Sequence, residues 1–201
     1  MKKIGVYCGS FNPVHNGHIA IASACIEEGL VDEVLIVATG AYWEKNDFYP
    51  LKDRIAMLKL AAKEGILIDE IHNENPYTCM IFKKLQEENK DVKYSLIIGA
   101  DNLPRFREWK NYEFLLQFDF IILPRGDIER GDVDAIMKDL HKENYVILNR
   151  ERIDISSTYI REHLNDHEAI KDMIDEKVYA YLKTMEEKDA ARDPEQTSIA
   201  G

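Results

Sequence analysis

The chain has 201 residues, of which 45% are hydrophobic and 31% charged, and its formal net charge at pH 7 is −11. This composition is that of an ordinary globular protein with one well-buried domain. The excess of negative charge argues against a broad nucleic-acid interface and against attraction to an anionic membrane. No apolar run approaches the roughly 20 residues of a membrane span, and the first residues make a poor signal peptide. We therefore expect a cytoplasmic protein.

Short apolar runs rich in β-branched residues alternate with helical patterns. Strands are predicted at residues 2–9, 33–38, 66–71, 94–99, 118–124 and 145–149, and helices at 16–29, 51–65, 77–89, 132–143 and 155–164. A last amphipathic helix carries Ile170, Ile174, Val178 and Tyr181. This alternation predicts an α/β fold, a doubly wound (Rossmann-like) parallel sheet with helices on both faces. Ligands of such sheets bind beyond the carboxyl ends of the strands.

The domain organisation follows from where the apolar material ends. Residues 1–185 are predicted to form a single domain, since no linker or internal repeat divides them. Residues 186–201 carry little apolar material and are predicted to form a disordered tail. Three cysteines, Cys8, Cys25 and Cys79, are far apart and show no C-x-x-C spacing, so we expect reduced thiols rather than disulfides or a zinc site.

The turn after the first strand, G-S-F-N-P-V-H-N-G-H from Gly9 to His18, lies where this fold places phosphates. It matches neither the dinucleotide fingerprint nor the P-loop. Gly9 and Ser10 would let backbone N–H groups approach an anion, and the helix that follows adds the positive end of its dipole. His15 and His18 would face the same pocket as a phosphate clamp. A metal pair would need further ligands that no nearby cluster supplies, and a purely structural pair remains the other alternative.

An anionic ligand of this acidic chain would need a local concentration of positive charge. The candidate cations near the turns are Lys45, Arg54, Arg105, Arg107, Arg125 and Arg161.

Five landmarks in chain order resemble one family. His15–His18 is similar to the H-x-G-H signature of the nucleotidyltransferase superfamily, and "ISSTYIREHL" to its second signature. Between them lie "NPYTCMIFKKL", "LIIGADNLPRFREWKNYEFLL" and "FIILPRGD". Together they resemble the nicotinate (nicotinamide) mononucleotide adenylyltransferases, over the chain from about Lys2 to Lys183.

The resemblance implies adenylyl transfer from ATP to nicotinate mononucleotide, which gives deamido-NAD and pyrophosphate in NAD biosynthesis. The attacking phosphate is already an anion at neutral pH, so alignment and charge neutralisation replace a general base. Mg²⁺ is implied as the companion of ATP, although no protein ligand set for it is visible in the sequence.

By the same resemblance, His15, His18 and Arg161 are the expected catalytic residues. The expected ATP site comprises Gly9, Ser10, Phe11, His15, His18, Gly99, Asp101, Ser156, Ser157, Thr158 and Arg161. Two simpler interpretations stay open, because Ser156 could be an ordinary helix N-cap and Asp101 could cap the helix that follows it.

The expected acceptor site comprises Lys45, Tyr77, Thr78 and Trp109, with the indole stacked on the pyridine ring. Trp109 could instead pack on a neighbour, and Lys45 could be a solvated surface lysine. Glu44 stands where the family usually has histidine, which puts the acceptor in doubt. Nicotinamide mononucleotide and phosphopantetheine therefore remain alternative acceptors.

Two further classes of function compete with the enzyme: a nucleotide sensor without turnover, and a structural interaction module. The intact His15, His18 and Arg161 favour the enzyme over both. The expected partners are ATP and a pyridine mononucleotide, with no nucleic acid and no membrane. The sequence leaves the oligomeric state open, a homo-oligomer included.

Overall fold

The computed structural model describes residues 1–39 and 48–192. Within them one parallel sheet is formed by β1 (Lys2–Gly9), β2 (Glu33–Ala38), β3 (Ile66–Ile68), β4 (Val92–Gly99), β5 (Asp119–Leu123) and β6 (Tyr145–Ile147). The strand order is β3-β2-β1-β4-β5-β6, and every neighbouring pair is parallel. The predicted doubly wound α/β fold is confirmed. The order reverses between β1 and β4, and such a switch point opens a crevice at the carboxyl ends of the two strands.

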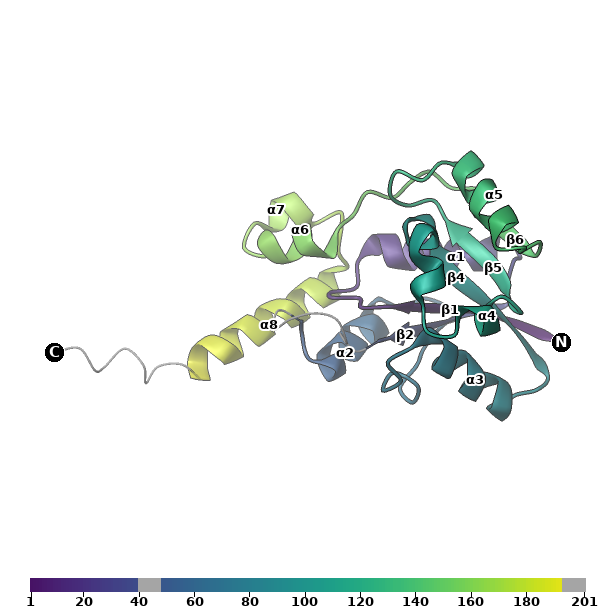
Figure 1. The fold of residues 1–201 in the computed structure, drawn as a ribbon. Helices are drawn as coiled ribbons and strands as arrows, with labels where there is room; N and C mark the ends of the chain where they lie inside the picture. The colour runs from purple at the N-terminus through teal and green to yellow at the C-terminus, as the bar shows by residue number, and fades with distance from the viewer. Residues whose placement is uncertain (40–47, 193–201) are drawn as a thin grey trace.

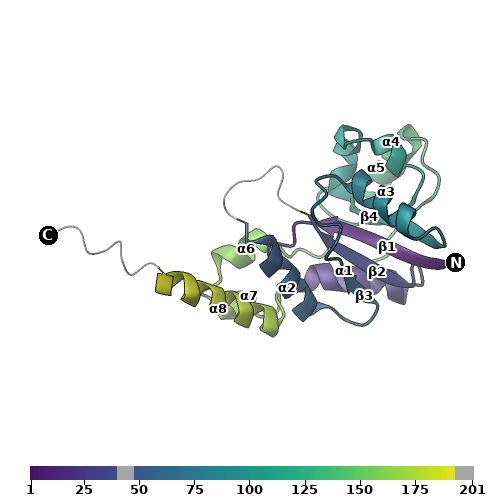
Figure 2. The ribbon, with the colours of Figure 1, turned by 90° about the horizontal axis from the view of Figure 1, so that it is seen from below.

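Helices cover both faces of the sheet (Figure 2). One face carries α1 (Asn16–Glu27) and α2 (Leu51–Ala61), and the other carries α3 (Thr78–Glu88), the 3-10 helix η1 (Ala100–Glu108), α4 (Tyr112–Leu115) and α5 (Arg130–Asp139). The last three helices are α6 (Ser157–Glu162), α7 (His167–Ile170) and α8 (Glu176–Arg192). These three gather at the side of the sheet toward which the strands run (Figure 1).

The central parts of the long strands are apolar on both sides because both faces of the sheet are covered. In β1, Val6 belongs to the cluster under α3 and α5, while Tyr7 belongs to the cluster under α1 and α2. The same alternation holds in β5, where Phe120 and Ile121 face opposite clusters. Successive strand side chains point to opposite faces, so a two-sided core needs a continuous apolar run.

Several predicted boundaries differ from the structure, among them the following three. The strand predicted at 66–71 ends at Ile68, because the Asp69 carboxylate turns the chain by accepting the His72 backbone N–H at 2.7 Å. The single last helix is divided into α7 and α8, and Asp175 accepts the Lys177 N–H at 2.8 Å where α8 begins. Helix α8 continues to Arg192, past the predicted end of the domain at residue 185. The rest of the predicted tail lies outside the described residues.

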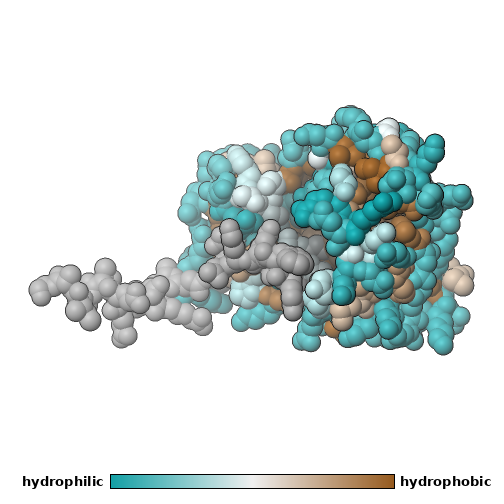
Figure 3. All heavy atoms as spheres, viewed as in Figure 1, coloured by the Kyte–Doolittle hydropathy of each residue, from teal (hydrophilic) through white to brown (hydrophobic). Residues whose placement is uncertain are grey.

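The described surface is largely polar. Hydrophilic residues cover most of the face seen in Figure 3, and apolar residues form smaller patches between them. No helix among the described residues has the length and apolar character needed to cross a membrane.

Arg54 on α2 is a buried cation that holds the backbone next to the switch point. Its side chain is 3% exposed and donates to the carbonyl oxygens of Ser10 at 2.6 Å, Thr39 at 2.9 Å and Tyr49 at 3.0 Å. Burial lowers the pKa of its guanidinium. The sequence suggested Arg54 as a ligand-binding cation, but the structure uses it to join the turn after β1 to the segment after β2.

We expect Arg54→Met to lower the free energy of unfolding by about 3 kcal/mol, because it leaves buried carbonyl oxygens without a donor. Urea denaturation followed by circular dichroism measures this change. Arg105→Met is the matched control, since the Arg105 side chain is 78% exposed. Equal stability of the two variants would contradict the structural role.

Candidate active site

A cavity of about 410 Å³ opens at the carboxyl end of β1. Its walls come from two segments far apart in sequence, Tyr7 to His18 and Arg152 to Arg161, with contributions from Phe48, Asp101 and the 125–126 turn. The volume falls in the range of small-molecule sites. The cavity thus lies where a doubly wound sheet binds its ligand, with both predicted signature segments in its wall.

The turn after β1 is shaped by a buried phenylalanine. Phe11 has φ +45°, is buried, and packs edge-on against Tyr7 and His18 with ring centroids 5.3 and 4.9 Å apart. A Cβ at Gly9 would come within 3.1 Å of the Phe11 ring. Gly9 is therefore needed for packing inside the turn, while Phe11 forms part of the floor of the cavity.

His15 and His18 form a stacked pair with ring centroids 3.6 Å apart. The His15 backbone N–H donates to Nδ1 of His18 at 3.2 Å. A neutral imidazole carries one N–H, so this bond leaves the proton of His18 on Nε2, available to a ligand. Both side chains line the cavity and are 7% and 9% exposed.

The environment keeps both histidines uncharged at neutral pH. Burial lowers the pKa of His15 to about 4, helped by the positive charge of Arg125. Burial, followed by His15 and Arg125, lowers the pKa of His18 well below its usual value. The pair therefore offers neutral N–H donors, which suits phosphate oxygens; a charged clamp would require two adjacent imidazolium ions.

Gly17 is required by the close approach of two side chains. A Cβ at this position would lie 2.9 Å from Cγ2 of Ile153 and 3.0 Å from Nδ1 of His15. The glycine of H-x-G-H thus lets the segment before α6 pack directly on the histidine turn.

The second signature is hydrogen-bonded to the first. Arg161 donates through Nη1 to the carbonyl oxygen of Asn12 at 2.6 Å and through Nη2 to Oγ1 of Thr158 at 3.3 Å. The Ser157 hydroxyl donates to the carbonyl oxygen of Pro13 at 2.9 Å. Ser156 is the N-cap of α6, as the simpler interpretation held, and its Oγ accepts the Tyr159 N–H. These bonds fix the distance between the two walls of the cavity.

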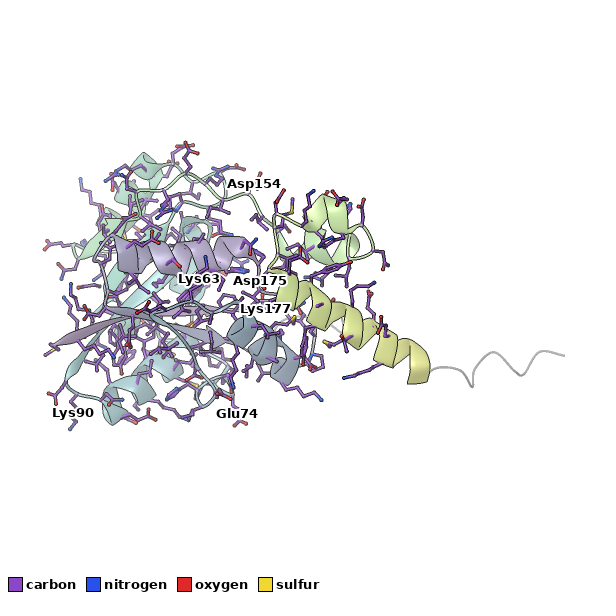
Figure 4. All side chains as sticks on the ribbon, turned by 180° about the vertical axis from the view of Figure 1, so that it is seen from behind. Lys63, Glu74, Lys90, Asp154, Asp175 and Lys177 are labelled. Carbon is purple, nitrogen blue, oxygen red and sulfur yellow. The ribbon has the colours of Figure 1, made fainter. Side chains whose placement is uncertain are left out.

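The start of α1 is bound to the C-terminal helices. The Asn16 backbone N–H donates to the carbonyl oxygen of Met173 at 2.8 Å, and its side-chain amide donates to that of Asp172 at 3.0 Å. Figure 4 labels Asp175, at the approach to α8, near this end of α1. The first N–H of α1 therefore joins the sheet domain to the segment between α7 and α8, which the sequence did not suggest.

The cavity has more positive than negative side chains in an acidic protein. Arg125, Arg152 and Arg161 line it, against Asp101 and Asp154, and the Arg125 Nε lies 3.6 Å from the Asp101 carboxylate. Arg152 and Asp154 were not predicted as site residues, although they directly precede the second signature. Figure 4 shows Asp154 on the coil that leads toward α6.

Several predicted residues lie elsewhere. Arg105 and Arg107 pair with Glu108 and Asp139 on the surface and do not line the cavity. Gly99 ends β4 outside the cavity wall, and a Cβ there would collide with Oδ1 of Asp101.

The predicted acceptor residues lie outside this cavity wall. Tyr77 is the N-cap of α3, and the Thr78 side chain lies next to the thiol of Cys8, which does line the cavity. Trp109 is partly exposed and packs on Phe106 with ring centroids 5.3 Å apart. One side of the indole therefore packs on a neighbour, which was the alternative to a stacking role. Lys45 and Glu44 lie outside the described residues.

No group of three or more His, Cys, Asp or Glu that could hold a metal ion occurs in the part of the chain that the structure describes. The histidine pair is therefore not part of such a group among the described residues.

We expect Gly17→Ala to weaken ATP binding about tenfold, because the added methyl group must displace the His15 ring or Ile153, and small misplacements are costly. Isothermal calorimetry measures the affinity. Gly131→Ala on α5 is the control, since nothing lies within 4 Å of a Cβ there. An unchanged affinity in Gly17→Ala would show that the close contact does not shape the site.

His15 should titrate near pH 4 in the folded protein, against about 6.5 in the unfolded chain. Since the unfolded state then binds the proton more tightly, this residue makes the fold less stable as the pH falls from about 6.5 toward 4. Imidazole NMR signals, assigned with His15→Asn, measure the midpoint in buffer and in urea. Equal midpoints in the two conditions would contradict the burial argument.

The comparison with known proteins identifies the family. A profile of the cytidylyltransferase-like family matches residues 6–163. A probable nicotinate-nucleotide adenylyltransferase of Clostridium acetobutylicum is 32% identical over 194 residues, which cover 91% of this chain and 97% of that protein. Another from Flavobacterium psychrophilum is 31% identical over 188 residues, which cover 90% and 95%.

Solved structures share the fold. The nicotinic acid mononucleotide adenylyltransferase of Plasmodium falciparum complexed with NaAD has a TM-score of 0.78 at 22% identity, covering 92% of this chain and 96% of that one. The same protein complexed with APC has a TM-score of 0.76 at the same identity and coverage. On the profile and the sequence identities, the chain belongs to the cytidylyltransferase-like family and, within it, to the nicotinate-nucleotide adenylyltransferases.

Proposed function

We propose that this enzyme transfers the adenylyl group of ATP to nicotinate mononucleotide, giving deamido-NAD and pyrophosphate in NAD biosynthesis. The observation that carries the proposal is the meeting of two neutral histidines with Arg161 in one cavity. The names of the relatives, which span nearly the whole chain, supply the acceptor.

The reaction is an in-line displacement at phosphorus. A phosphate oxygen of the mononucleotide attacks the α-phosphorus of ATP, and the bond from that phosphorus to the oxygen bridging to the β-phosphate breaks. The electron pair leaves with pyrophosphate. The attacking oxygen carries no proton that must be removed, so the protein acts by aligning the two phosphates and by stabilising the extra negative charge.

Each cavity residue has a proposed part in this displacement. His18 donates its Nε2–H to the α-phosphate, where charge grows in the transition state, and His15 donates to the phosphates beside it. Arg161, Ser157 and Thr158 receive the β- and γ-phosphates, which become the leaving group. Arg161 uses two of its donors on the protein and keeps others for the ligand, because a guanidinium has five N–H groups.

Neutral donors suit a buried phosphate site. An N–H group that carries no charge needs no counterion when the site is empty. Its hydrogen bond to a phosphate oxygen nevertheless becomes stronger as negative charge develops on that oxygen. Because neither histidine changes charge near pH 7, we expect their contribution to be constant across the neutral range.

For the acceptor we propose Tyr77, Thr78 and Trp109, with Lys45 from the segment outside the described residues. The position of Thr78 next to the Cys8 thiol supports this, since it places the start of α3 against the cavity wall. The exposed side of Trp109 remains available to stack on a pyridine ring.

Gly9, Ser10, Phe11, Gly99, Asp101 and Ser156 complete the proposed ATP site. Mg²⁺ accompanies the triphosphate as part of the substrate, where phosphate oxygens and waters are its natural ligands. We place the enzyme in the cytoplasm, where ATP is supplied, as a protein without nucleic-acid or membrane partners.

The proposed function predicts pyrophosphate release from MgATP when nicotinate mononucleotide is added. His18→Ala should lower kcat by a factor of about 10² to 10³, because it removes a donor aimed at developing charge. A coupled pyrophosphate assay measures both, with nicotinamide mononucleotide and phosphopantetheine as competing acceptors.

His167→Ala is the matched control, since His167 does not line the cavity. It lies on α7 and pairs with Glu176 at the start of α8. Faster release with another acceptor would reassign the substrate. ATP binding without release on any of the three would favour the nucleotide sensor.

A further inference from the structure

A buried histidine that does not line the cavity lies between two carboxylates. His72, which is 4% exposed, places Nδ1 2.6 Å from Oδ1 of the buried Asp69 and Nε2 3.0 Å from Oε2 of Glu88. Asp69 directly follows β3, and Glu88 is the last residue of α3. The imidazole thus connects the end of an edge strand to the end of the next helix.

The geometry requires a particular protonation state. Both ring nitrogens face carboxylate oxygens at hydrogen-bond distance, but a neutral imidazole has only one N–H. Only the imidazolium ion can donate to Asp69 and Glu88 at the same time. Loss of its proton must break one of the two bonds, and the half-exposed Glu88 is the partner that can turn to solvent.

The same cluster fixes the loop that leads into α3. The second Asp69 oxygen, Oδ2, accepts the backbone N–H groups of His72 at 2.7 Å and Ile71 at 3.2 Å. The carbonyl oxygen of His72 accepts the backbone and side-chain N–H groups of Asn75, at 3.0 and 2.8 Å. Figure 4 shows Glu74, on this loop, and Lys90, just past Glu88, toward opposite ends of α3. The imidazole is thus linked, through Asp69 and Asn75, to several backbone groups of residues 69–75.

The loop delivers the chain to the proposed acceptor residues. After Pro76, the loop continues into Tyr77 and Thr78 at the start of α3, and the Thr78 side chain lies next to Cys8 in the cavity wall. A shift of the loop would thus be passed to the acceptor side of the site, while His15, His18 and Arg161 belong to other segments.

We propose that His72 is a positioning residue, whose imidazolium bridge between Asp69 and Glu88 holds Tyr77 and Thr78 in place for the acceptor. This inference rests on the proposed function and adds to it a residue that touches neither substrate. On this proposal, the affinity for the mononucleotide depends on the Asp69–His72–Glu88 bridge, which lies away from the residues that bind the ATP phosphates.

Because the bridge needs a protonated His72, acceptor binding should weaken at alkaline pH. Burial alone would lower the pKa of His72, but hydrogen bonds to Asp69 and Glu88 and their negative charges raise it overall. Around the cluster, Cys8 on β1 faces Asp69 and Tyr94 on β4 faces Glu88. Since the raised pKa belongs to the folded state, the bridge is complete below that pKa as long as Asp69 and Glu88 are ionised. It is lost as the pH rises through that pKa.

The test is the KM for nicotinate mononucleotide and for ATP, measured from pH 6 to pH 9.5. In wild type the acceptor KM should rise at the alkaline end while the ATP KM stays level. Glu88→Gln removes one negative charge, so the alkaline rise should begin about one pH unit lower. His72→Asn should raise the acceptor KM about tenfold at neutral pH and remove its alkaline rise. His167→Asn, which alters an exposed histidine–carboxylate pair, should match wild type.

Amide hydrogen exchange of residues 71–78, corrected for intrinsic rates, gives a second readout that needs no turnover. Protection should fall in wild type at alkaline pH and at lower pH in Glu88→Gln. An unchanged acceptor KM together with unchanged protection in Glu88→Gln and His72→Asn would overturn the proposal, even if both variants were less stable. If wild type releases no pyrophosphate with this acceptor, the proposed function fails. The exchange profile then decides the positioning role of His72 by itself.

Discussion

The site depends on the contact between α6 and the turn after β1. Arg161 and Ser157 donate to the carbonyl oxygens of Asn12 and Pro13, so two segments separated by most of the chain become the walls of one cavity. Both carbonyl groups lie in the turn after β1, outside the hydrogen-bond ladder of the sheet. A buried acceptor without a donor is costly. The bonds that close the cavity therefore also complete the hydrogen bonding of the turn, which couples folding to assembly of the site.

This arrangement explains how an acidic protein can bind an anion. The excess negative charge is spread over the surface, while Arg125, Arg152 and Arg161 lie around one cavity that also receives donors from His15 and His18. Arg54 has a different role: its guanidinium donates to the backbone carbonyl groups of Ser10 and Thr39 and so holds the turn in shape. Local placement of charge decides what is bound, and the net charge does not.

Three buried histidines show how the surroundings of a side chain decide its chemistry. His15 and His18 lie near Arg125 and each other, so burial and positive charge both disfavour protonation. His72 is as well buried but lies between Asp69 and Glu88, whose hydrogen bonds and negative charges raise its pKa in spite of burial. The first environment suits donors to phosphate, and the second suits a rigid ionic bridge. No property of the histidine residue itself distinguishes these cases, since all three have the same intrinsic pKa.

The sequence by itself determined the parallel sheet and the position of the turn after β1, because a mostly apolar strand followed by a glycine turn and a helical repeat has few other solutions. It also pointed to His15, His18, Ser157 and Arg161, because chain-local motifs retain their spacing. Only the tertiary structure revealed the burial that keeps the histidines neutral, the structural use of Arg54, the lining by Arg152 and Asp154, and the Asp69–His72–Glu88 bridge. These features join residues distant in the chain, and both burial and electrostatics are set by such neighbours, which a local pattern does not contain.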